Sequence, residues 1–104
     1  MIVVWTDQAG ERLAEIEDYI ARRGSLRRAE TFVSEIIEAT NQQLSRHPRS
    51  GRRVPEVPGS RLRERIHRGY RIVYRIRRGR VEVITVFEGH RLLPRQDLPD
   101  SESE

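Results

Sequence analysis

The chain of 104 residues contains no cysteine and no lysine, and only 6% of its residues are aromatic. Without cysteine, a disulfide scaffold, thiolate metal sites and cysteine nucleophiles are excluded. No apolar run approaches the roughly 20 residues of a membrane-spanning helix, and the first residues become charged too early for a signal peptide. We therefore expect one small cytoplasmic domain.

The basic residues are all arginine, and they are unevenly distributed. Residues 1–45 contain 5 arginines and 8 acidic residues, residues 46–95 contain 15 and 4, and residues 96–104 contain none and 4. A polyanionic partner is therefore indicated for the middle segment only. Arginine is suited to phosphate or carboxylate, but a genome rich in arginine codons would also explain the absence of lysine.

The first half of the chain has the pattern of a short strand followed by two helices. The apolar run 2–5 predicts a strand, and apolar residues then recur at three- and four-residue steps over about 7–23 and 26–45. Gly24 fits the end of the first helix, and Ser25 fits the N-cap of the second. Because the connection is so short, the helices must form an antiparallel hairpin.

The second half predicts a loop followed by three strands. Residues 47–60 contain three prolines and two glycines, which is typical of a loop. Apolar residues and arginines then alternate over 61–66 and 70–77, whereas 81–87 is more continuously apolar, as in a central strand. The order β-α-α-β-β-β predicts an α+β fold of two layers, in which the helical hairpin covers one face of a small, antiparallel-rich sheet.

Arginines repeat along two of the predicted strands and form an arginine ladder. Its members are Arg61, Arg63 and Arg65 in one strand and Arg71, Arg75 and Arg77 in the next. Like charges facing each other across strands cost about 0.2–1 kcal/mol per pair. We expect this ladder on the sheet face that the helices leave uncovered, where it would bind phosphates or an acidic peptide; the alternative is a solvated face. Glu64 lies within the ladder and is a candidate to pair with an arginine.

Several motifs extend over nearly the whole chain. They are GRRVPE at 51–56, GYRIVYRI at 69–76, VEVITV at 81–86 and RLLP at 91–94. In this order they resemble the RelE/ParE toxin superfamily, and its ParE-like members more than its RelE-like ones. The resemblance implies the toxin of a type II toxin–antitoxin system, of the kind associated with plasmid stabilization. Such a toxin arrests growth until a cognate antitoxin wraps it with an acidic or amphipathic segment.

The superfamily implies two different activities. ParE-like members inhibit DNA gyrase without chemistry of their own, and the long helical hairpin with the GRRVPE loop and RLLP ending favours them. RelE-like members are ribosome-dependent endoribonucleases that cut mRNA, for which Arg71 and Arg91 would hold phosphate. His90 or Glu88 would then replace a catalytic Tyr or His that is missing here. Whether the chain is an enzyme depends on this choice. A non-catalytic nucleic-acid-binding module is a third possibility.

The resemblance and the charge pattern together give a set of candidate site residues. We expect the target or the antitoxin to contact Arg61, Arg63, Arg65, Arg71, Arg75 and Arg91. The three histidines have no paired ligand spacing, so neither a metal site nor a cofactor is expected. We expect one toxin domain over residues 1–95 and an acidic, mobile tail over 96–104, in which only Leu98 is apolar enough to bury.

Overall fold

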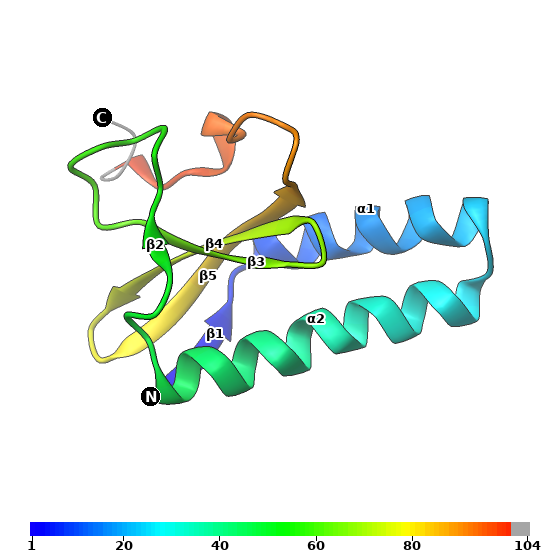
Figure 1. Cartoon of the computed structure of the whole chain (residues 1–104), viewed down its shortest axis with the longest axis horizontal. Helices are drawn as coiled ribbons and strands as arrows, with labels where there is room; N and C mark the ends of the chain where they lie inside the picture. Colours follow the sequence, from blue (N-terminus) through cyan, green and yellow to red (C-terminus); the bar gives the residue numbers. More distant parts are fainter. Residues whose placement is uncertain (101–104) are drawn as a thin grey trace.

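The computed structural model describes residues 1–100 of the chain. Figure 1 shows a helical hairpin on one side of a twisted sheet. The elements are β1 (Ile2–Trp5), α1 (Asp7–Arg23), α2 (Leu26–Arg46), β2 (Arg52–Arg53), β3 (Arg63–His67), β4 (Tyr70–Arg77), β5 (Arg80–Glu88) and the short 3-10 helix η1 (Arg95–Asp97). The predicted α+β fold is therefore confirmed.

Both helices begin at a polar cap. The Thr6 hydroxyl accepts a hydrogen bond from the Ala9 N–H (3.2 Å), and the Ser25 hydroxyl accepts one from the Arg28 N–H (3.1 Å). These oxygens satisfy N–H groups that a helix leaves without partners in its first turn. Neither helix of the described chain combines the length and the apolar character that crossing a membrane would require.

The sheet has five strands in the order β1-β5-β4-β3-β2. β1 pairs with β5 in parallel, and every other neighbouring pair is antiparallel. The turn between β4 and β5 has positive φ at both Arg78 (54°) and Gly79 (75°), the backbone of a tight hairpin turn. The short strand β2 lies inside the segment 47–60, where the sequence predicted only a loop.

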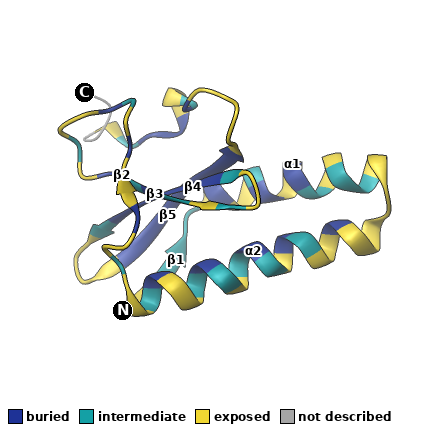
Figure 2. Cartoon of the chain, viewed as in Figure 1, coloured by how far each residue is buried: buried dark blue, intermediate teal, exposed yellow. Residues whose placement is uncertain are grey.

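The main hydrophobic core lies between the helices and the sheet. Buried residues of α1 and α2, such as Leu13 and Ile36, pack against Ile72 and Tyr74 of β4. The Tyr74 hydroxyl is buried and accepts a hydrogen bond from the Gly51 N–H (2.9 Å), so the apolar ring packs while its polar atom stays satisfied. Figure 2 shows the exposed residues of both helices facing away from the sheet.

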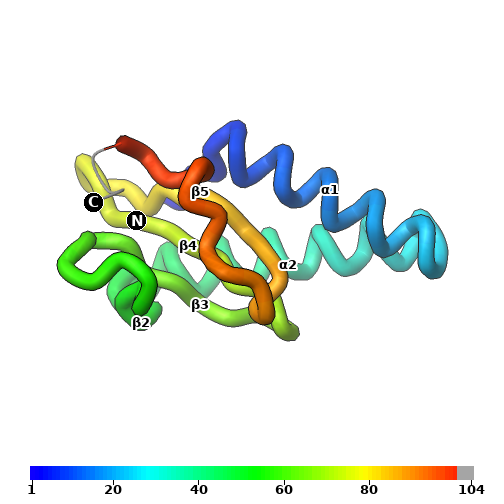
Figure 3. Tube along the Cα trace, turned by 90° about the horizontal axis from the view of Figure 1, so that it is seen from above, coloured from blue at the N-terminus to red at the C-terminus, as the bar shows by residue number. Residues whose placement is uncertain are grey.

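The other face of the sheet is not open, contrary to the prediction. A second buried cluster covers it, with residues from the loop after β2, from the sheet and from the C-terminal segment: Val54, Val57, Leu62, Val73, Ile84, Phe87, Leu93 and Leu98. Figure 3 shows the C-terminal segment crossing the sheet on the side away from α2. Single apolar residues next to prolines, such as Val54, Val57 and Leu93, thus help to cover this face of the sheet.

The C-terminal segment is packed further than the sequence indicated. Asp97 and Leu98 are both buried, and Asp97 accepts hydrogen bonds from Arg12 and Thr85. The expected start of a mobile tail at residue 96 is therefore wrong for these residues, because the partners of Asp97 come from distant parts of the chain. The end of the predicted tail, residues 101–104, lies outside the described residues.

Candidate functional site

The predicted arginine ladder is divided between the two faces of the sheet. Arg63 and Arg65 of β3 lie opposite Tyr74 and Ile72 of β4, and residues paired across strands share a face. Because Tyr74 and Ile72 belong to the helix-facing core, Arg63 and Arg65 point to the helix side. Because odd-numbered residues of β3 pair with even-numbered residues of β4, Arg63 and Arg65 lie on the opposite face of the sheet from Arg71. The sequence pattern alone could not show this register.

On the helix side, these two arginines bind backbone oxygens. Arg65 Nη1 donates to the carbonyl of Ala39 in α2 (2.8 Å), and Arg63 Nη1 donates to the carbonyl of Gly51 (2.8 Å). Burial lowers the pKa of Arg65 below its ordinary value. Both side chains therefore fasten β3 to its neighbours and are not presented to an external anion.

On the other face, Arg71 is buried and fully paired. Its Nε donates to Glu64 (2.8 Å), while its Nη1 and Nη2 donate to Glu56 (2.8 and 2.7 Å). These hydrogen bonds from Arg71 lower the pKa of Glu56 to about 2. The predicted pairing of Glu64 with an arginine is confirmed. Arg71 is not an open phosphate site, because two carboxylates already occupy its donors.

The remaining arginines of the ladder are dispersed. Arg75 is also buried and donates to Glu82 (2.9 Å), whereas Arg61 and Arg77 are exposed in a loop and at the end of β4. The expectation of one continuous arginine surface is therefore wrong. Two of its members contribute to the interior of the molecule instead.

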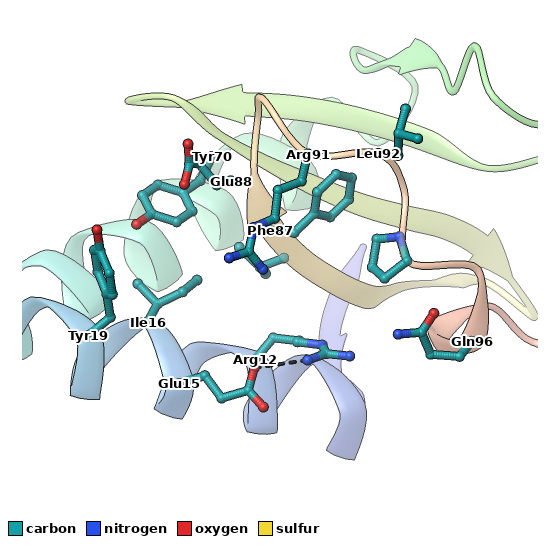
Figure 4. A pocket seen from close by; sticks show the side chains of 12 residues that line it. Arg12, Glu15, Ile16, Tyr19, Tyr70, Phe87, Glu88, Arg91, Leu92 and Gln96 are labelled. Carbon is teal, nitrogen blue, oxygen red and sulfur yellow. Dashed lines mark hydrogen bonds and ion pairs between the residues drawn. The ribbon is translucent and has the colours of Figure 1, made fainter.

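One of the predicted site residues, Arg91, lines a groove. The groove lies between α1 and the segment that follows β5, and its volume is about 330 Å³. Figure 4 shows the Arg91 side chain directed into it, between Tyr70 on one side and Arg12 of α1 on the other. The other lining residues are Glu15, Ile16, Tyr19, Val86, Phe87, Glu88, Leu92, Pro94 and Gln96.

The segment that presents Arg91 is held by its backbone. The Gly89 N–H donates to the Gly69 carbonyl (2.7 Å), and a side chain at Gly89 would place its Cβ 2.8 Å from the same oxygen. Further along, the Leu93 N–H donates to Glu56 (3.2 Å), and the Leu93 side chain is buried. Between these anchors, Arg91 and Leu92 are exposed, Leu92 to 84%.

The opposite wall of the groove is built by Arg12. This arginine donates twice to Asp97 (2.8 Å each) and once to Glu15 (2.9 Å). These hydrogen bonds raise the pKa of Arg12. Burial alone would raise the pKa of Asp97, but the hydrogen bonds from Arg12 and Thr85 keep it below its ordinary value. The ion pair with Asp97 thus holds the charge of Arg12 in a fixed position on this wall of the groove.

Two tyrosines give the groove an aromatic rim that the sequence analysis missed as functional. Tyr19 of α1 is 52% exposed, and Tyr70 stacks at a tilt on Phe32, with ring centroids 5.5 Å apart. Burial, with Glu88 nearby, raises the pKa of Tyr70, so its hydroxyl stays protonated. In the sequence, the position of Tyr19 beside the apolar stripe of its helix was the feature that could have indicated this role.

The groove is suited to binding rather than to acid–base chemistry. His90 is exposed, and no side chain in residues 1–100 is hydrogen bonded to it, so nothing orients its ring as a catalytic base requires. Nor do the described residues bring three acidic or histidine side chains together as metal ligands. Arg91, Leu92 and the tyrosines instead offer a cation and apolar surface side by side.

Comparison with known proteins gives a matching family and several solved structures of similar fold, two of which are described here. The family described as "ParE toxin of type II toxin-antitoxin system, parDE" matches residues 3–93. A structure of the chromosomal ParDE toxin–antitoxin system of Pseudomonas aeruginosa has a TM-score of 0.73 and 21% identity, covering 85% of this chain and 95% of that one. The RelBE2 toxin–antitoxin complex of Mycobacterium tuberculosis has a TM-score of 0.61 and 21% identity, with 84% and 95% covered. No curated protein sequence is significantly similar.

Proposed function

The chain belongs to the ParE toxin family of type II toxin–antitoxin systems, and from this we propose that it arrests growth by binding and inhibiting DNA gyrase. The family match covers the fold together with the groove segment up to residue 93. The higher TM-score to the ParDE structure than to the RelBE2 complex agrees with this choice. Gyrase inhibition by a small toxin needs a binding surface and no catalytic group.

The observation that carries the proposal is that Arg71 is held by ion pairs and that His90 is exposed. A nuclease would need a cation open to the scissile phosphate and an oriented proton acceptor. Here Arg71 is engaged by Glu56 and Glu64, and His90 is an exposed residue of the turn after β5. The projecting pair Arg91 and Leu92 supports recognition of a protein target instead.

The same groove is our candidate site for the antitoxin. The two solved structures described above come from toxin–antitoxin systems. An amphipathic acidic segment would place apolar side chains on Tyr19 and Leu92 and a carboxylate on Arg91. Occupation of the groove would then prevent the contact with the target, which explains neutralisation by simple competition.

The experiment that tests the proposal reads two activities from the same preparation. Purified toxin is added to purified gyrase with relaxed plasmid, and separately to ribosomes translating an mRNA. We expect supercoiling to stop and the mRNA to remain intact, and we expect the cognate antitoxin to restore supercoiling. Uninhibited supercoiling at saturating toxin would overturn the proposal.

A RelE-like nuclease is the second candidate, since the fold is also similar to a chain of the RelBE2 complex. In that case Arg91 would hold the phosphate, and the protonated hydroxyl of Tyr70, which lines the same groove, would donate to the leaving oxygen. Cleavage of mRNA on ribosomes, lost in Tyr70→Phe and retained in Tyr19→Phe, would establish this activity in place of gyrase inhibition.

A further inference from the structure

Exposed arginines are concentrated at the end of the molecule that lies opposite the tip of the helical hairpin. We call them the basic end: Arg46 at the end of α2, Arg49, Arg52, Arg53 and Arg61 around β2, and Arg77, Arg78 and Arg80 at the β4–β5 turn. The charge excess of the middle segment thus gathers at one end of the molecule and not on a sheet face. Neither the groove nor the proposed gyrase contact uses it.

Hydrogen bonds and strand pairing bring the β2 part of the basic end to α2. Arg63 Nη1 donates to the carbonyl of Arg49 (3.2 Å), which follows α2. Arg53 of β2 lies directly opposite Arg63 of β3. The backbone around Arg49 and Arg53 is therefore fixed to the same strand end.

The β4–β5 turn is joined to α2 through β1. The Met1 amino group donates to the carbonyl of Ser45 in the last turn of α2 (2.9 Å). The next residue, Ile2, pairs with Arg80 at the start of β5. Figures 1 and 3 show the end of α2, β2 and the β4–β5 turn at the same end of the long axis.

Few acidic side chains offset this charge. Arg52 pairs with Glu64, and Arg80 pairs with Glu82. Within residues 1–100, no carboxylate forms an ion pair with five of the eight arginines, which are Arg46, Arg49, Arg53, Arg77 and Arg78. Of these, Arg53 donates to the carbonyl of Ser60. Exposed charges of one sign at one end create a positive potential that attracts polyanions from solution.

We propose that the basic end binds the phosphate backbone of a nucleic acid. Guanidinium groups match phosphate oxygens in a two-point geometry. Three strand spacings of about 4.8 Å separate β2 from β5, so the end is about 14 Å wide at the sheet. A duplex carries one charge per about 1.7 Å of its axis when both strands are counted, so a stretch of this length carries about eight phosphate charges.

The surroundings of the basic end favour phosphates over a protein partner. A protein interface needs an apolar centre as well as charge. Among the described residues, the exposed large apolar side chains are Met1, Ile2, Tyr19, Leu26, Ile66 and Leu92. Only Met1 and Ile2 border the basic end, and the basic segments 46–61 and 77–80 contribute none.

The test measures binding of the purified full chain to a fluorescent DNA duplex and to a single-stranded RNA at increasing salt. The variant carries Arg46→Gln, Arg49→Gln, Arg77→Gln and Arg78→Gln. For the duplex, each lost phosphate contact reduces the slope of log affinity against log salt concentration by about 0.9. We therefore expect the four substitutions to reduce this slope by up to about 3.6 and to lower the affinity at low salt by more than about tenfold. Tighter binding of the DNA or of the RNA identifies the source of the phosphates.

The chain offers a control of equal charge at the other end of its long axis. The variant Arg22→Gln, Arg23→Gln, Arg27→Gln and Arg28→Gln changes four exposed arginines near the hairpin tip, and we expect it to retain the slope of the unsubstituted chain. An equal loss in both variants, or equally tight binding of an acidic peptide of matched charge, would overturn the proposal. The assay contains no gyrase, so its result is independent of the proposed function.

Discussion

The guanidinium of Arg71 donates to both carboxylate oxygens of Glu56, with Nη1–Oε2 and Nη2–Oε1 distances of 2.8 and 2.7 Å. Through this pair the loop after β2 is fastened to β4. Glu56 also accepts the Leu93 N–H, so one carboxylate holds the C-terminal segment as well. The position of Arg91 in the groove therefore depends on an ion pair that the groove itself does not contain.

Replacing Arg71 should destabilise the fold. Arg71→Ala leaves the buried carboxylate of Glu64 without its Arg71 partner and releases Glu56, and breaking a buried pair in this way costs about 3–5 kcal/mol. The free energy of unfolding from urea titration measures the loss. Arg77→Ala on the same strand is the control, because Arg77 is exposed and its loss should stay within about 0.5 kcal/mol. Equal stabilities of the two variants would contradict this role of Arg71.

The Glu56 carboxylate should make stability depend on pH in the acid range. Hydrogen bonds from Arg71 lower its pKa from 4.5 to about 2, so folding favours the ionised form. Its contribution, at most about 3 kcal/mol, is complete above the unfolded pKa and is lost as the pH falls from about 4.5 to about 2. Unfolding free energies measured against pH should show a smaller acid loss in Glu56→Gln. Parallel curves for the two proteins would refute the assignment.

Position 89 should tolerate no side chain, because two backbone segments approach each other closely at Gly89. In Gly89→Ala the new Cβ would lie 2.8 Å from the Gly69 carbonyl oxygen, so the segment after β5 must shift, at a cost of about 1–3 kcal/mol. We expect gyrase inhibition to fall with it. Gly10→Ala is the matched control: nothing lies within 4 Å of its Cβ, and alanine in a helix gains about 0.5–1 kcal/mol. Both effects are read from thermal unfolding and the supercoiling assay.

Arg91 and Leu92 should separate activity from stability. Both are exposed, so Arg91→Ala and Leu92→Ala should change the unfolding free energy by less than about 0.5 kcal/mol. If the pair contacts gyrase, each loss should raise the toxin concentration for half-inhibition of supercoiling by about tenfold or more. Arg22→Ala at the hairpin tip serves as the control of equal charge. Unchanged inhibition by both variants would place the contact elsewhere.

The local elements could be predicted from sequence because local rules specify them. The apolar spacing and the cap at Ser25 predict the second helix to within a residue of its end. β2 could not be predicted, because two arginines in a loop have no strand pattern of their own. It exists because Arg52 and Arg53 find partners on β3.

The candidate site could be predicted only in part, because its geometry depends on register and on distant partners. Arg91 was recognised from its motif, and it lines the groove. Alternation along one strand cannot reveal which face its neighbour shares, so Arg63 and Arg71 were assigned to one surface although they lie on two. Nor could the sequence show that Glu56, fifteen residues from Arg71, would occupy its donors.

The parallel pairing of β1 with β5 has a consequence for the order of events during synthesis. Thr6 donates to the carbonyl of Val83, 77 residues further along, and the groove is completed only by residues beyond β5. Contacts of such long range form late, since the chain between them must first be ordered. A nascent chain therefore lacks a complete groove until the residues beyond β5 have been synthesised, and a product terminated within β5 contains neither Arg91 nor Leu92.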